Sequence, residues 1–143
     1  MNKKDLKEIV LKVIDERSAD IIAIGEKILA NPEMGYREFE TARLVKEELE
    51  KLSVRYRDGL AITGVRGTLA GRTHNAHVAV IGGFRGSLHS KDFSVADRVS
   101  AYVTPAKLMT LTVIDLLAYK AEKALEIKKS FTPKMTKEEY LAF

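Results

Sequence analysis

Apolar residues recur every three or four positions along the first thirty residues, which places them on one face of a helix. These apolar positions are Leu6, Ile9, Val10, Val13, Ile14, Ile21, Ile24 and Ile28. Ser18-Ala19-Asp20 could divide the stretch in two, but one helix over residues 3–30 is the simpler prediction. Asn31-Pro32 ends it, because the residue before a proline is disfavoured in the helical conformation.

The next segments predict one more helix and three strands. Residues 38–52 carry a second helical apolar face interleaved with glutamates and lysines. Residues 53–58 and 63–70 alternate apolar and polar positions, which is typical of strands, and Asp58-Gly59 between them is a turn signal. Residues 77–82 form a β-branched apolar run, so we expect a central strand that is buried on both faces.

The last third of the chain is predicted to be mainly helical. Residues 83–103 look irregular, and Thr104-Pro105 opens a helix, with Thr104 as the N-cap. Residues 105–118 are apolar almost all round, which is typical of a buried helix, and residues 119–130 continue as a charged helix. Thr136 and Glu139 form a capping box for a last helix over 137–142.

This order of elements predicts an α/β fold: a single domain over residues 1–143, with a small three-stranded sheet packed with helices. Hairpins are expected to join the strands. The length allows a real core, and 45% hydrophobic with 31% charged residues is an ordinary composition. We expect the apolar helix over 105–118 to pack on the sheet.

Charge and cysteine content narrow the functional classes. The net charge is +4, but 24 basic and 20 acidic residues are interleaved, so we expect no nucleic-acid partner. The longest near-apolar run is Val78–Gly83, so we expect no membrane partner. No cysteine is present, which excludes disulfides and cysteine-based sites. No apolar signal core follows the first residues, and a cytoplasmic location is therefore expected.

Two groups of motifs carry a resemblance. Pro32-Glu33, with Gly35, Glu38 and Thr41, is followed by Thr63-Gly64-Val65 and the apolar run Val78–Ile81. This order resembles the N-terminal signature of the aminoacylase-like zinc metallopeptidase and amidohydrolase family, which includes hydrolases of p-aminobenzoyl-glutamate. The family usually has glycine where Ser53 stands. By the resemblance, Glu33 and Glu38 are not catalytic acids, and we expect them to serve helix starts.

The second group, Ser87-Leu88-His89-Ser90-Lys91-Asp92-Phe93, resembles the C-terminal end of the same family. The resemblance implies that full-length relatives hydrolyse an amide bond with two zinc or manganese ions, and it makes His89 a vestigial metal ligand. The family's other metal ligands and its Glu-Glu general base are missing from this sequence. Glu138-Glu139 belongs to the predicted capping box. We therefore interpret residues 1–82 and 83–143 as two family-like segments joined at a deletion seam at Gly82–Gly83.

Other sites are weaker candidates. His74 and His77 are spaced for one face of a helix, but they lie where a turn enters a predicted strand, and there i and i+3 point to opposite faces. A site built from His74, His77 and His89 requires residues 83–90 to fold back. The glycine-rich residues 82–87 lack the lysine of a phosphate-binding loop.

The sequence therefore predicts a truncated amidohydrolase or peptidase homologue that is inactive alone, a pseudoenzyme with no catalytic residues, no cofactor-binding residues and no cofactor of its own. Removal of the family's middle should uncover apolar surface, so we expect a homo-oligomer with Leu108–Leu117 or Val78–Ile81 near the interface. Two alternatives stay open. One is a regulatory or oligomerisation module that pairs with itself or with an intact amidohydrolase. The other is an enzyme whose site is completed by a partner chain.

Overall fold

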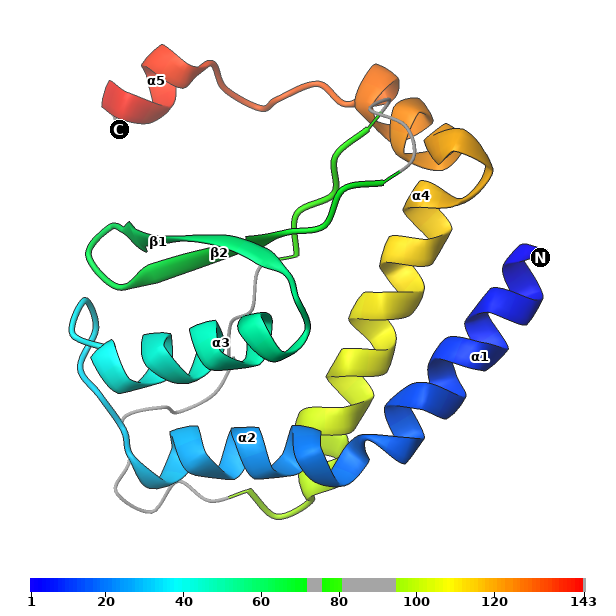
Figure 1. Ribbon diagram of the computed structural model, residues 1–143. Helices are drawn as coiled ribbons and strands as arrows, with labels where there is room; N and C mark the ends of the chain where they lie inside the picture. Colours follow the sequence, from blue (N-terminus) through cyan, green and yellow to red (C-terminus); the bar gives the residue numbers. More distant parts are fainter. Residues whose placement is uncertain (72–75, 81–94, 143) are drawn as a thin grey trace.

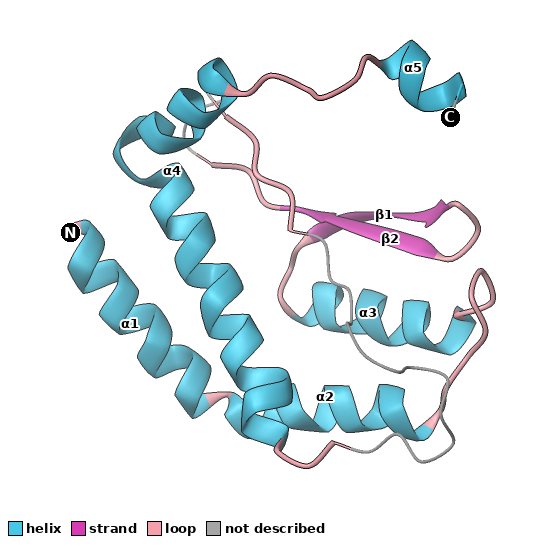
Figure 2. Ribbon diagram, turned by 180° about the vertical axis from the view of Figure 1, so that it is seen from behind, coloured by secondary structure: helices cyan, strands magenta, loops and turns pink. Residues whose placement is uncertain are grey.

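The computed structural model describes residues 1–71, 76–80 and 95–142 of the chain, as an open arrangement of helices around one β-hairpin (Figures 1 and 2). Its elements, in chain order, are α1 (Lys3–Glu16), α2 (Ser18–Ala30), α3 (Phe39–Lys51), β1 (Arg55–Leu60), β2 (Gly64–Thr68), the π-helix η1 (Val99–Val103), α4 (Thr104–Ser130) and α5 (Lys137–Ala142). Helix α1 lies alongside α4, α2 packs on η1, and α3 lies against the hairpin.

The prediction of one helix over residues 3–30 is wrong, because the chain breaks at Arg17. This residue has φ −97° and ψ 8°, outside the helical region. The Arg17 Nε atom donates to Asp20 Oδ2 at 2.9 Å, across the first turn of α2. At the other end of α1, Asn2 Oδ1 accepts from the Asp5 amide at 2.9 Å and caps the helix. The break falls one residue before the Ser18-Ala19-Asp20 segment that was the possible point of division.

Helix α3 and both strands of the hairpin are found where the pattern predicts them. The strands pair antiparallel, with Tyr56 opposite Gly67, and the register is irregular between Arg57 and Leu60. The predicted turn at Asp58-Gly59 is wrong: Gly59 takes φ +68° within β1, and the chain turns at residues 61–63 instead. A glycine at positive φ allows such an irregularity without ending the strand.

The mixed α/β class is confirmed, but the three-stranded sheet is not. The sheet formed by the described residues has the two strands β1 and β2. Residues 77–80 of the predicted central strand are irregular, and its residues 81 and 82 lie outside the described ranges. A β-branched run acquires a strand conformation only beside a paired neighbour.

The segment before α4 is more regular than predicted. Asp97 Oδ1 accepts from the amides of Val99 at 2.9 Å and Ser100 at 3.1 Å, and so begins η1 inside the span 83–103 that was expected to be irregular. Thr104 has φ −60° and ψ −47°, so the predicted N-cap lies inside a continuous helical run. Pro105 stands in the first turn of α4, as predicted.

Helix α4 is broken near its middle. Ala118 has ψ 157°, and Tyr119, Lys120 and Ala121 have φ between 51° and 64°, in the left-handed region. The break separates the apolar and charged halves at the boundary predicted at residue 118. Residues Val99–Ser130 are long and apolar enough to cross a membrane by length and composition alone. Helix η1 and the first part of α4 run together from Val99 to the break, and Asp115 within this run is paired with lysines of α1.

The predicted core and the burial of the helix over 105–118 are wrong. Val103 and Ala121 are the buried hydrophobic residues of the described chain, and Leu108 is 60% exposed. The helices therefore present apolar faces that the described elements do not cover.

The last helix, α5, begins with a capping box. The Thr136 amide donates to Glu139 Oε2 at 2.6 Å, and the Glu139 amide donates to Thr136 Oγ1 at 3.2 Å. This reciprocal pair is the predicted capping box. It also accounts for the Glu138-Glu139 pair without a catalytic role.

Candidate functional site

Glu33, in the loop between α2 and α3, serves the start of α3. Its two carboxylate oxygens accept from the backbone amides of Glu40 at 2.9 Å and Thr41 at 2.8 Å. The amide of Glu40, followed by that of Thr41, holds the pKa of Glu33 below its ordinary value. These amides lack partners within the helix, so a carboxylate seven residues upstream satisfies them. The expected structural role of Glu33 is confirmed.

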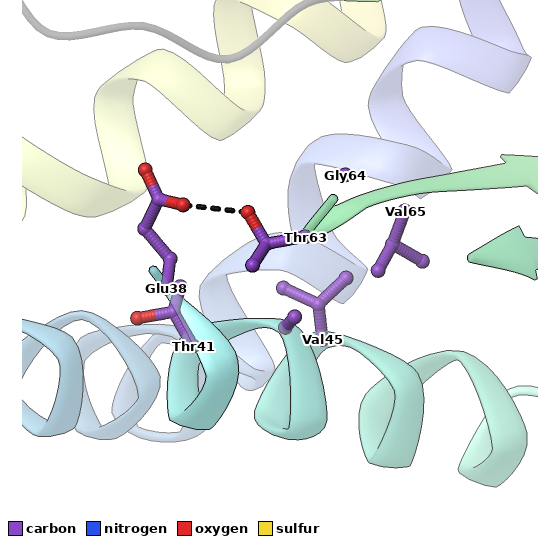
Figure 3. Close-up of a pocket in the computed structure, with 7 residues that line it drawn as sticks. Glu38, Thr41, Val45, Thr63, Gly64 and Val65 are labelled. Atoms are coloured by element: carbon purple, nitrogen blue, oxygen red, sulfur yellow. Dashed lines mark hydrogen bonds between the residues drawn. The ribbon is translucent and has the colours of Figure 1, made fainter. Parts of the chain in front are cut away.

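Glu38 joins the start of α3 to the start of β2 (Figure 3). Its Oε2 atom accepts from the Thr63 hydroxyl at 2.6 Å, and this hydrogen bond is the main cause of a lowered Glu38 pKa. Glu38 stands immediately before α3, where it was expected, but its side chain makes no capping bond to that helix. It acts instead as a cross-link between two elements.

These two elements form the walls of a shallow pocket of about 270 Å³. The lining residues are Glu38, Thr41, Ala42, Val45, Thr63, Gly64 and Val65. Figure 3 shows the Glu38–Thr63 hydrogen bond on one side and the valines on the other. The pocket therefore offers one ionised carboxylate and two hydroxyls beside an apolar wall. A hydrolytic site needs either several metal ligands or a nucleophile paired with a base, and these lining residues supply neither.

The histidines of the sequence are placed only in part. His77 is exposed in the segment 76–80, whereas His74 and His89 lie outside the described ranges, as does the seam at Gly82–Gly83. Over residues 1–71, 76–80 and 95–142, no group of three or more histidine, aspartate or glutamate side chains is placed to hold a metal ion. The residues described here thus do not fit the two-metal centre that the resemblance implies. The role of His89 stays a prediction.

Two polar contacts were not predicted from the sequence. Asp97, which caps η1, lies three residues before Ser100 and also accepts from the Ser100 hydroxyl at 2.6 Å. This spacing is an ordinary helix-start signal that could have been found. Thr63, the partner of Glu38, is 25 residues away along the chain. No local pattern marks such a pair.

Comparison with known proteins gives short matches to hydrolases. The chain is 45% identical over 60 residues to IAA-amino acid hydrolase ILR1-like 5 of Arabidopsis thaliana, a match covering 42% of this chain and 14% of the relative. It is 49% identical over 47 residues to ILR1-like 2 of the same plant, covering 33% and 11%. It is 36% identical over 77 residues to thermostable carboxypeptidase 2 of Saccharolobus solfataricus, covering 53% and 20%.

The similarity is confined to a small part of each relative. The matched residues span between 11% and 20% of the length of these three proteins. No family model matches the chain, and no solved structure matches it. The partial matches support a relationship between this chain and the amidohydrolase and peptidase family.

Proposed function

We propose that this chain is a truncated homologue of a metal-dependent amidohydrolase or peptidase that is catalytically inactive alone. The observation that carries the proposal is that, in the part of the chain that the structure describes, no three side chains able to bind a metal ion lie together. Glu33 binds backbone amides and Glu38 binds Thr63. Both carboxylates serve the scaffold, and among the described residues that line the pocket Glu38 is the one acid and none is a histidine. The short matches to hydrolases supply the family context.

We also propose that this chain holds no metal cofactor of its own and is cytoplasmic. We expect no zinc or manganese ion to be held tightly by this chain alone, because a stable site needs three or four ligands in one place. We expect a cytoplasmic protein, because the sequence contains no cysteine to form disulfides.

Metal analysis together with a hydrolysis assay tests this proposal. The purified chain is dialysed against zinc or manganese, and its metal content is measured by mass spectrometry. N-acyl amino acids, including an IAA-amino acid, are then offered as substrates, with the IAA-amino acid hydrolase ILR1-like 5 of Arabidopsis as the positive control of the assay. We expect less than one metal ion per chain and no hydrolysis above the blank.

Stoichiometric metal with measurable turnover would contradict the proposal. His89→Ala and His77→Ala are the matched variants in that case. Loss of metal in the His89 variant alone would establish a site that includes His89. Turnover that appears only after a second protein is added would establish an enzyme completed by a partner chain.

A regulatory or oligomerisation module is the second candidate function, favoured by the exposed apolar surface. Leu108 and Leu117, in the apolar half of α4, are 60% and 40% exposed. Surfaces of this kind mark interaction sites. Co-purification with an intact amidohydrolase, tested by tagging the chain at either end, would support a regulatory role in a heteromeric complex.

A further inference from the structure

The break in α4 stands in a sequence that favours an unbroken right-handed helix. Tyr119, Lys120 and Ala121 have φ of 51°, 62° and 64°, and Ala118 before them has ψ 157°. The left-handed conformation is disfavoured for residues that carry a Cβ atom, above all for several in succession. Residues 118–124 read Ala-Tyr-Lys-Ala-Glu-Lys-Ala, and alanine, lysine and glutamate are among the best helix formers. The local sequence therefore opposes the break.

Helical backbone continues on both sides of the break. Helix η1 and the first part of α4 lead up to Ala118, and α4 resumes at Glu122 and ends at Ser130. A change of residues 118–121 to right-handed values would join the two parts into one helix. The bent and straight forms of α4 thus differ in the backbone of four residues, which is how a hinge between two discrete states is built.

Contacts with α1 favour the bent form. Lys3 Nζ lies 5.8 Å from the centre of the Tyr119 ring and 3.1 Å from Asp115 Oδ1, so one side chain of α1 contacts both the break and the helix before it. The N-terminal end of α1 lies near the broken end of α4 (Figures 1 and 2). Ala121 is only 4% exposed, so the break is packed and is not a frayed end.

We infer that residues 118–121 are a conformational switch, in which α4 is bent while the first turn of α1 contacts it and straightens when that turn is displaced. A cation above an aromatic ring and a partly exposed ion pair are both modest contacts, so a partner that binds Lys3 can shift the equilibrium. Straightening would move the charged half of α4 and the following α5, which now lies on the hairpin side (Figure 1). The inference does not depend on whether the chain hydrolyses amides.

A distance across the break tests the inference in the full chain. The sequence has no cysteine, so Leu108→Cys and Ile127→Cys can carry two nitroxide spin labels without other sites. Both residues are exposed, at 60% and 46%. A straight helix separates their backbone positions by about 28 Å. We expect pulsed electron paramagnetic resonance to give a shorter main distance in the chain with no further substitution.

Two substitutions of Lys120 should move this distance in opposite directions. Lys120→Gly should raise the ratio of bent to straight forms at least about 30-fold, because glycine adopts positive φ freely and is a poor helix former. Lys120→Val should lower the same ratio about 5-fold, because a β-branched residue is strongly disfavoured at positive φ. The same substitutions at Lys123, which is exposed in the right-handed part of α4, are the matched controls and should leave the ratio unchanged.

Lys3→Met tests the role of α1. It removes both Lys3 contacts and should shift the ratio about 5-fold toward the straight form. Lys4→Met is the control, because Lys4 lies in the same turn of α1, is 85% exposed and pairs with Glu8. Adding Lys120→Gly to Lys3→Met should restore the short distance.

Circular dichroism checks that each variant folds, and the Lys120 variants decide the question if Lys3→Met does not fold. A main distance of about 28 Å in the chain without further substitutions would show a straight α4 and overturn the inference. Equal shifts in the Lys3→Met and Lys4→Met variants would also overturn it, as would one unchanged distance in all the variants.

Discussion

The hairpin unit, made of the Glu33 loop, α3, β1 and β2, differs from the helical unit, made of α1, α2, η1 and α4, in how its parts are joined. In the hairpin unit, hydrogen bonds join elements that are close in sequence. Examples are the bonds that the carboxylates of Glu33 and Glu38 accept. In the helical unit, α1 is joined to α4, far along the chain, by ion pairs including those of Lys3 and Lys7 with Asp115.

The two units also differ in which polar groups are paired and which apolar residues are buried. The hairpin unit makes these polar contacts within about 35 residues of chain, although Phe39, Leu52 and Ile62 stay mostly exposed. The helical unit has helices with long apolar faces, but the described chain buries only Val103 and Ala121. Surface ion pairs contribute little stability. Both of these buried residues lie in the helical unit, and the described hairpin unit buries no hydrophobic residue, so both units leave apolar surface uncovered and differ in how their polar groups are joined.

Gly64→Ala should have the largest effect and should act on the hairpin unit. A Cβ atom at residue 64 would lie 2.5 Å from the Leu60 carbonyl oxygen, a backbone atom that cannot move without breaking the register. We expect a loss of about 3 kcal/mol of unfolding free energy, measured by chemical denaturation. Gly35→Ala is the control, because its Cβ would find its nearest neighbour at 4.0 Å. Equal losses in the two variants would contradict the proposed clash.

Gly25→Ala should have an intermediate effect and should act on the helical unit. A Cβ atom at residue 25 would lie 2.4 Å from the Tyr102 ring, where α2 packs on η1. Overpacking costs about 1–3 kcal/mol and the higher helix propensity of alanine returns about 1, so we expect a net loss of about 1 kcal/mol. The near-ultraviolet signal of tyrosine should change, while NMR signals of the hairpin unit stay in place. Shifts spread over both units would show that the two are coupled.

Asp115→Asn should have the smallest effect, and salt should remove it. In about 1 M salt the screening length falls to about 3 Å, so the stabilities of the variant and the unmodified chain should converge. The lysines, Lys7 first and then Lys3, hold the Asp115 pKa below its ordinary 3.8 by bonding the charged form. Their contribution is thus present above pH 3.8 and is lost as the pH falls through the lowered value. A stability difference that persists in acid or in high salt would assign Asp115 another role.

The elements that the sequence predicts well are those set by neighbouring residues. Helix α3, the two strands and the Thr136–Glu139 capping box follow from apolar spacing and cap chemistry within a few positions. The change from apolar to charged residues at 118 follows from composition, but the helix was expected to continue there and the structure breaks it instead. Each of the correctly predicted features needs no information from distant parts of the chain.

The features that the sequence did not predict depend on contacts across the molecule. A pattern of apolar residues in 105–118 indicates a surface suited to burial, but burial requires a partner element, and Leu108 lacks one in the described chain. The same holds for the third strand, which needs a paired neighbour. The Glu38–Thr63 bond depends on the packing of α3 against the hairpin, which the spacing of residues does not reveal. The assignment of His89 remains a prediction, since the residue lies outside the described ranges.

The left-handed backbone of Tyr119, Lys120 and Ala121 also limits how far α4 extends in one direction. An unbroken helix of the 27 residues of α4 would extend about 40 Å in one direction. The bend turns its last part instead, and the chain continues across the hairpin side to α5 (Figure 1). The non-helical backbone of residues 118–121 therefore shortens the molecule along the axis of α4.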